Sequence, residues 1–165
     1  MLYYIEIRRD KYVSWRAKEH LKKYGVEEKV KEVTVSTATV VEAAKAVGCI
    51  EAMIAKTLSF DVSGKTILIL MAGDAKVDNS KYKKEFGIKA KMLQYDEVEE
   101  RVGHKVGGVC PFGINEGVEV YLDESLKRFE KVYPACGSNN SFIELTIKEL
   151  EEYSNFVKWI KISKV

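Results

Sequence analysis

Hydrophobic and polar positions follow two different periods along this chain. Short runs rich in β-branched and aromatic residues are typical of strands, and they alternate with segments whose apolar positions recur every three to four residues, as in amphipathic helices. Ser63-Gly64-Lys65 separates two of the strand-like runs and predicts a hairpin turn, so we expect those two strands to pair antiparallel. The predicted strands cover residues 30–35, 57–62, 66–71, 89–93, 118–122, 131–133, 142–145 and 156–162.

The helical segments carry their own start and stop signals. Thr39 is followed three residues later by Glu42, which is a capping box, and Gly48 is a suitable end for the helix that begins there. A charged amphipathic helix is expected over residues 12–24, where we expect His20 to be solvated. Further helices are predicted to begin at Asp78 or Ser80, at Asp96, and at Thr146.

These patterns predict an α+β fold with a mixed, largely antiparallel β-sheet that curls, flanked by helices. No repeat, linker or low-complexity segment divides the sequence, so we expect a single domain over residues 1–165. With 46% hydrophobic residues in 165, the chain is long enough to close a hydrophobic core.

Charge and cysteine content narrow the functional classes. A net charge of +2 does not predict the broad cationic surface of sequence-independent DNA binding, although basic residues are frequent over 8–31 and 76–91. Three cysteines without a CxxC spacing favour a reducing compartment over a disulfide framework. The N-terminal residues do not resemble a signal peptide, and no apolar run reaches the roughly 20 residues of a membrane span. We therefore expect a cytoplasmic protein without a membrane partner.

The segment GHKVGGVCPFG, residues 103–113, concentrates four of the eleven glycines. It contains neither the GxGxxG motif of dinucleotide-binding proteins nor the GK[ST] end of a P-loop. From the pattern alone, the segment is either a turn or a loop that binds a ligand. Cys110 and His104 suggest a thiol nucleophile, but a buried structural cysteine is the simpler interpretation, since free cysteine behaves as a small hydrophobe. Cys49, Cys110 and Cys136 lack the spacing of zinc ligands. We expect no metal and no cofactor.

Two charged residues near the ends of predicted strands, Lys56 and Asp74, are candidates for a binding site. Lys56 lies between apolar neighbours in IAKTL, where it either extends its ammonium group into water or points into a pocket as an anchor for an anionic group. Asp74 follows the strand that ends near Met71, a place where charged residues line a cleft or a solvated turn. For Lys56 the pattern does not choose between the two alternatives, whereas for Asp74 it favours the solvated turn.

Six segments in a fixed order resemble one known family. They are TVVEAAKAVGC, IAKTLSF, ILILMAGDAKVDNSK, GHKVGGVCPFGI, VYLDESL and CGSNNSFIELT. Together they resemble the YbaK / prolyl-tRNA synthetase-associated editing domain family, over about residues 33–150. The resemblance implies a curled mixed sheet. It also implies that Lys56 lies in the substrate pocket and contacts the tRNA end.

The family's GxxxP loop corresponds to Gly107, Gly108, Val109, Cys110 and Pro111. The resemblance implies that the backbone of this loop holds the aminoacyl group and the terminal ribose. It implies a hydrolase that serves translation fidelity, a trans-acting aminoacyl-tRNA deacylase with Cys- or Ala-tRNA(Pro) as the foremost substrate. It further implies that aminoacyl-tRNA is the partner and that prolyl-tRNA synthetase is a candidate partner.

Alternatives remain at this point. One is a non-catalytic module of the same fold that recognises a tRNA end, a nucleotide or a synthetase, and another is a thiol hydrolase that uses Cys110. ACGSNNSF departs from the family's pattern after the late strand, which leaves cysteinyl-, alanyl- and seryl-tRNA open. Basic residues of the N-terminal helix either contact acceptor-stem phosphates or form a solvated face. Substrate-binding residues are expected at Val35, Phe60, Met71, Asp74, Cys136, Gly137 and Ser138.

Overall fold

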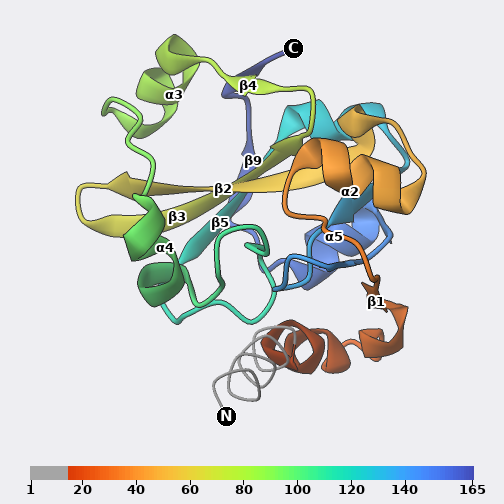
Figure 1. The fold of residues 1–165 in the computed structure, drawn as a ribbon. Coiled ribbons are helices and arrows are strands. Elements are labelled where there is room, and N and C mark those ends of the chain that lie inside the picture. The colour runs from red at the N-terminus through yellow and green to blue at the C-terminus, as the bar shows by residue number, and fades with distance from the viewer. Residues whose placement is uncertain (1–14) are drawn as a thin grey trace.

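The computed structural model describes residues 15–165 and is built around a six-stranded sheet (Figure 1). The strand order in the sheet is β8-β6-β2-β3-β5-β9. The strands are β2 (Ile54–Val62), β3 (Lys65–Ala72), β5 (Glu119–Asp123), β6 (Lys131–Pro134), β8 (Leu145–Thr146) and β9 (Lys158–Ile160).

The long hairpin of β2 and β3 forms the centre of this sheet, as predicted. Its register runs from Ala55 opposite Ala72 to Val62 opposite Lys65. Ser63 and Gly64 connect the strands with φ of 52° and 89°. Two successive left-handed residues are the requirement of a type I′ turn, whose twist matches that of the flanking strands.

The sheet is mixed, which confirms the predicted α+β class. Pairs β2–β3 and β6–β8 are antiparallel, whereas β2–β6, β3–β5 and β5–β9 are parallel. The sheet also curls, because Thr146 at one edge and Trp159 at the other edge line the same surface hollow. Two small antiparallel ladders complete the strands, β1 (Lys31–Glu32) with β7 (Ser141–Phe142) and β4 (Lys76–Val77) with β10 (Ser163–Lys164).

Most helix boundaries agree with the capping signals. Thr39 Oγ1 accepts the Glu42 N–H at 3.1 Å, and Gly48 ends the helix with φ of 82°. The start predicted at Asp96 is wrong, because Gln94 is the N-cap and Glu97 reaches back to its N–H at 3.3 Å. The α-helices are α2 (Val40–Val47), α3 (Asn79–Phe86), α4 (Tyr95–Val102) and α5 (Ile147–Tyr153), and the 3-10 helices are η1 (Glu27–Lys29), η2 (Glu51–Met53) and η3 (Glu124–Arg128).

Four predicted strands are shorter than expected. Residues 156–162 contain only the three-residue strand β9. Residues 30–35 and 142–145 contain only two-residue strands, and residues 89–93 contribute a single bridge between Met92 and Phe60. Around that bridge Asp61 N–H binds Lys91 O at 2.8 Å and Leu93 N–H binds Ser59 O at 3.0 Å. The segment therefore pairs with the end of β2 over one antiparallel bridge and does not form a full strand.

The N-terminal helix is described over residues 15–22, and the predicted residues 12–14 lie outside the described part. It lies against the glycine-rich segment, where Arg16 Nη1 donates to Gly103 O at 3.0 Å. His20 is not solvated as expected, since it is only partly exposed and its Nε2 lies 2.7 Å from Tyr153 O. Burial lowers the pKa of His20. This helix therefore packs its inner face on the loop that it covers.

The hydrophobic core lies around β3, where Leu68, Ile69 and Leu70 have no exposed surface. Side chains on both faces of β3 are buried because neighbouring strands and helices cover the sheet on both sides. Over residues 15–165, no helix has the length and apolar character that crossing a bilayer would require.

Candidate active site

A cavity of about 450 Å³ lies along one edge of β2. On that side β2 pairs with β6 only at Ile54 and Ala55, and it bridges Met92 only at Phe60. The stretch of β2 between these contacts faces the cavity instead of another strand. Its lining comes from five parts of the chain, namely Thr37–Val40 with Ala43, Ile54–Ser59, Met92–Leu93 with Tyr95 and Val98, Val106–Gly107 with Val109, and Tyr133, Ala135, Ser141 and Phe142.

Lys56 lies on β2 in this lining and is half-buried. Its Nζ donates to Gly73 O at 3.3 Å and to Ala75 O, both in the loop that follows β3. Burial lowers the pKa of Lys56, and the nearby Asp74 carboxylate opposes this by raising it. The ammonium group is thus held by two carbonyls beside the cavity and retains further donor capacity for a ligand.

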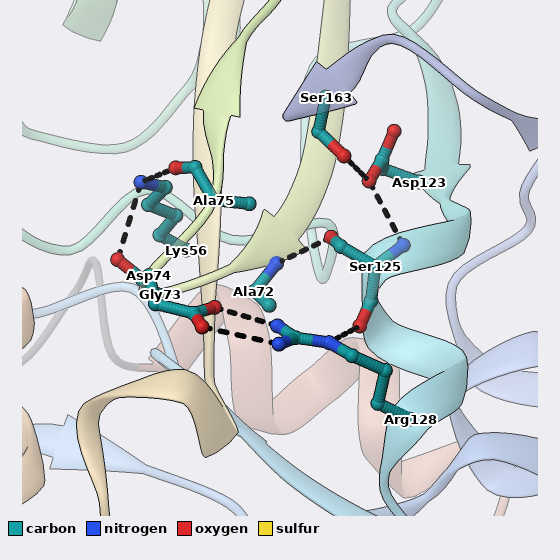
Figure 2. Close-up of polar contacts among 9 residues, drawn as sticks. All are labelled: Lys56, Ala72, Gly73, Asp74, Ala75, Asp123, Ser125, Arg128 and Ser163. Atoms are coloured by element: carbon teal, nitrogen blue, oxygen red, sulfur yellow. Dashed lines mark hydrogen bonds and ion pairs between the residues drawn. The ribbon is translucent and has the colours of Figure 1, made fainter. Parts of the chain in front are cut away.

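The loop that holds Lys56 is itself held by an ion pair (Figure 2). Asp74 Oδ1 lies 2.6 Å from Arg128 Nη2, and Oδ2 lies 3.1 Å from Nη1. Arg128 lowers the pKa of the Asp74 carboxyl group, first through these hydrogen bonds. Asp74 is therefore adjacent to Lys56 in space but does not line the cavity.

The glycine-rich segment forms one wall of the cavity. Gly107 and Val109 line it, and Gly107 has φ of +94°, where an added Cβ would lie 3.2 Å from Ala38 Cβ. Gly108 faces away from the cavity, where a Cβ would lie 2.5 Å from Ser138 N. Gly108 O also accepts the Gly137 N–H at 3.0 Å. Only glycine allows this close approach between the two loops.

Cys110 and His104 are buried together behind the wall, each without exposed surface. His104 Nε2 lies 2.6 Å from Phe112 O and 3.4 Å from Cys110 Sγ, while Nδ1 has no partner. Burial lowers the pKa of His104 to about 4 and raises the pKa of Cys110 to about 12. Both groups are thus neutral near pH 7, and the thiol is not a thiolate nucleophile. Pro111, the last residue of the wall, is buried as well.

The structure does not bring the other predicted substrate contacts into the lining. Phe60 and Met71 are buried in the core, where the Phe60 ring packs on Tyr82 at 5.1 Å. Val35 is 55% exposed. The segment Cys136, Gly137 and Ser138 lies behind the cavity wall, where it packs against Gly108. Lys56, Gly107 and Val109 are the predicted site residues that meet in the lining.

Pattern analysis missed several lining residues. Thr37, Leu58 and Tyr95 belong to this group, together with the start of α2. The position of Lys56 could have pointed to its neighbour Leu58, because the edge of a strand that borders a cavity exposes consecutive residues to it. Residues 15–165 contain no group of three His, Cys, Asp or Glu side chains arranged for a metal ion.

The fold is that of a small α+β domain, and its cavity of about 450 Å³ is lined by one lysine, Lys56, and by part of the glycine-rich segment. A family model for the aminoacyl-tRNA editing domain matches residues 34–153. The chain belongs to this family.

Individual relatives agree with this assignment. The Bacillus subtilis (strain 168) protein YwhH, whose function is uncharacterized, is 53% identical over 146 residues, covering 88% of this chain and 93% of YwhH. A proline–tRNA ligase of Bacillus cytotoxicus is 34% identical over 85 residues, which are 51% of this chain but 15% of the ligase. A crystal structure described as a candidate trans-editing enzyme for prolyl tRNA synthetase superposes with a TM-score of 0.83 at 30% identity, covering 93% of this chain and 98% of that one.

Proposed function

We propose that this protein is a trans-acting aminoacyl-tRNA deacylase that hydrolyses the ester of a misacylated tRNA, with Cys- or Ala-tRNA(Pro) as the foremost substrate. The supporting observation is the meeting of Lys56, Gly107 and Val109 in one cavity of about 450 Å³. Family membership and the resemblance to a candidate trans-editing enzyme add support.

The composition of the cavity fits hydrolysis by positioning. Among the described residues, the lining contains no cysteine, histidine or carboxylate side chain. An aminoacyl ester is already activated, so a held geometry and a correctly placed water or substrate hydroxyl supply much of the rate. Backbone N–H groups of the glycine-rich wall stabilise the developing oxyanion in this proposal. Lys56 anchors the polar end of the substrate.

Size supplies selectivity in this proposal. Apolar side chains, including Val40, Leu58 and Val98, line the cavity, and an apolar wall distinguishes groups by volume. One methylene in such a pocket changes binding by about 1–3 kcal/mol. A small misattached amino acid is therefore accepted more readily than the larger proline.

The decisive experiment compares wild type with Lys56→Ala on Cys-, Ala- and Ser-tRNA(Pro), with Pro-tRNA(Pro) as the correctly charged control. We expect wild type to hydrolyse at least one mischarged tRNA and to leave Pro-tRNA(Pro) intact. We expect Lys56→Ala to lose this hydrolysis. Lys65→Ala is a matched control, since Lys65 pairs with Glu119 at the far end of the hairpin. Full activity of Lys56→Ala would refute the site. Binding of tRNA without any hydrolysis would favour the non-catalytic module.

A further inference from the structure

The orientation of Lys56 depends on a loop whose fixation lies outside the cavity. Gly73 O and Ala75 O accept the two hydrogen bonds of Lys56 Nζ, and Asp74 lies between them in sequence. Gly73 packs closely against η2 and the start of α2, because an added Cβ there would lie 2.1 Å from Glu51 O and 2.7 Å from Val40 Cγ1. The position of the ammonium group is thus set by the backbone of residues 73–75.

Arg128, the last residue of η3, attaches this loop to η3 and is itself held by three hydrogen bonds. Two run to the Asp74 carboxylate at 2.6 and 3.1 Å, and Nε donates to Ser125 O at 2.9 Å. A planar guanidinium that is bound on both edges has one orientation. Neither Asp74 nor Arg128 lines the cavity, so neither touches a ligand there directly, and Lys56 is the charged group that connects their loop to the cavity.

A buried network fixes η3 in turn (Figure 2). Ser125 Oγ accepts the Ala72 N–H at 3.0 Å, and Ser125 N–H donates to Asp123 Oδ2 at 2.9 Å. Asp123 has no exposed surface and also accepts Ser163 Oγ–H at 2.6 Å and Ile162 N–H at 2.9 Å. The end of β3, η3 and the C-terminal strand therefore form one rigid support beneath the loop.

We propose that Asp74 and Arg128 are a positioning pair for Lys56, which hold the 73–75 loop so that the ammonium group faces the substrate. This inference rests on the proposed function, because it assigns the pair a task in the same cavity. A merely structural surface pair makes a different prediction. The two side chains are 34% and 38% exposed, and such surface pairs contribute little to stability and do not affect a distant reaction.

The activity test uses Asp74→Asn, Arg128→Gln and the double variant on whichever mischarged tRNA(Pro) wild type hydrolyses. Both single variants are expected to lower kcat/KM by about 10- to 100-fold, the scale of a misplaced anchor. The double variant should be no worse than the poorer single one, because the pair acts as a unit. Arg128→Lys keeps the positive charge but lacks the two-pronged guanidinium, so its kcat/KM should lie between those of wild type and Arg128→Gln. Glu85→Gln, which breaks a comparable pair with Lys158 at 2.9 Å, is the matched control and should retain full activity.

A substrate-free measurement separates positioning from a simple field effect. Asp74→Asn removes an anion and should lower the pKa of Lys56, whereas Arg128→Gln leaves Asp74 unneutralised and should raise it. Positioning predicts the same loss of activity in both variants despite these opposite shifts. NMR of ¹⁵N- and ¹³C-labelled lysine follows the pKa, and Lys56→Arg assigns the signal. The bound ammonium resonance should broaden in both variants but not in Glu85→Gln.

The outcomes separate this proposal from the proposed function. Activities equal to that of Glu85→Gln, or losses that multiply in the double variant, would overturn the positioning pair while leaving the deacylase intact. A wild type that hydrolyses none of the panel would overturn the deacylase. In that case broadening of the Lys56 resonance in both variants would still support the pair, and an unchanged resonance would overturn it.

Discussion

Gly108→Ala tests whether the glycine-rich wall is held by its close approach to the loop at residues 137–138. The new Cβ would lie 2.5 Å from Ser138 N and 2.7 Å from Gly137 C. Both neighbours are backbone atoms, which cannot rotate away as a side-chain end can. The two loops must therefore separate, and the hydrogen bond from Gly137 N–H to Gly108 O at 3.0 Å is lost or lengthened.

The expected cost follows from these two contributions. Overpacking costs about 1–3 kcal/mol, and a lost hydrogen bond costs about 1 kcal/mol. Their sum of about 2–4 kcal/mol corresponds to a fall in Tm of about 4–16 °C for a chain of this size. Deacylation is also expected to fall, since Gly107 and Val109 on either side of Gly108 line the cavity.

The assay is urea and thermal unfolding of Gly108→Ala beside Gly117→Ala. Gly117 has φ of +88° and nothing within 4 Å of a new Cβ, so this control reports backbone strain alone, about 1–2 kcal/mol. Its deacylase activity should stay at the wild-type level. A Gly108→Ala protein that is as stable as wild type would refute the close packing of the two loops.

Two further predictions concern the buried pair behind the wall. Cys110→Ser should leave deacylation unchanged, because the pKa of the fully buried Cys110 thiol is raised to about 12; loss of turnover in a folded variant would identify a thiol enzyme. Burial lowers the pKa of His104 from 6.5 to about 4, so the unfolded chain binds the proton more readily. Its contribution to stability is constant above about pH 6.5 and falls by about 3 kcal/mol as the pH drops to about 4. Urea titrations of wild type and His104→Gln across this range check this, and parallel pH curves would contradict it.

Local signals explain which parts of the fold could be predicted from the sequence. Helix α2 has Thr39 as its N-cap and Gly48 as its C-cap, as expected, because an N-cap and a left-handed C-terminal glycine depend on atoms within one helical turn. The turn at Ser63 and Gly64 is equally local. At α4 the pattern predicted a start at Asp96, because Asp is a favoured N-cap residue and Gln is not, yet the helix begins after Gln94. There the reciprocal contact with Glu97 decides in favour of Gln94.

The candidate site depended on long-range contacts and was harder to predict. The IAKTL pattern left Lys56 undecided, because its environment comes from a loop 17 to 19 residues away. Phe60 lies only four residues further along β2, yet it packs on Tyr82 in the core. No spacing rule separates these two positions. The difference arises because the segment around Met92 bridges β2 at Phe60 but not at Lys56, which only the assembled fold determines.

Substitutions in the glycine-rich wall and at Lys56 should therefore have different effects on stability and turnover. Wall residues such as Gly108 hold the cavity open through backbone packing, so substitutions there reduce stability and turnover together. Lys56 is half-buried, and burial lowers its pKa, which means that the fold bears a desolvation cost to place a cation there. Lys56→Ala should accordingly abolish turnover while leaving the free energy of unfolding unchanged or slightly increased. If Lys56→Ala instead unfolded as readily as Gly108→Ala, Lys56 would be a structural support of the 73–75 loop, and its loss of activity would no longer identify the site.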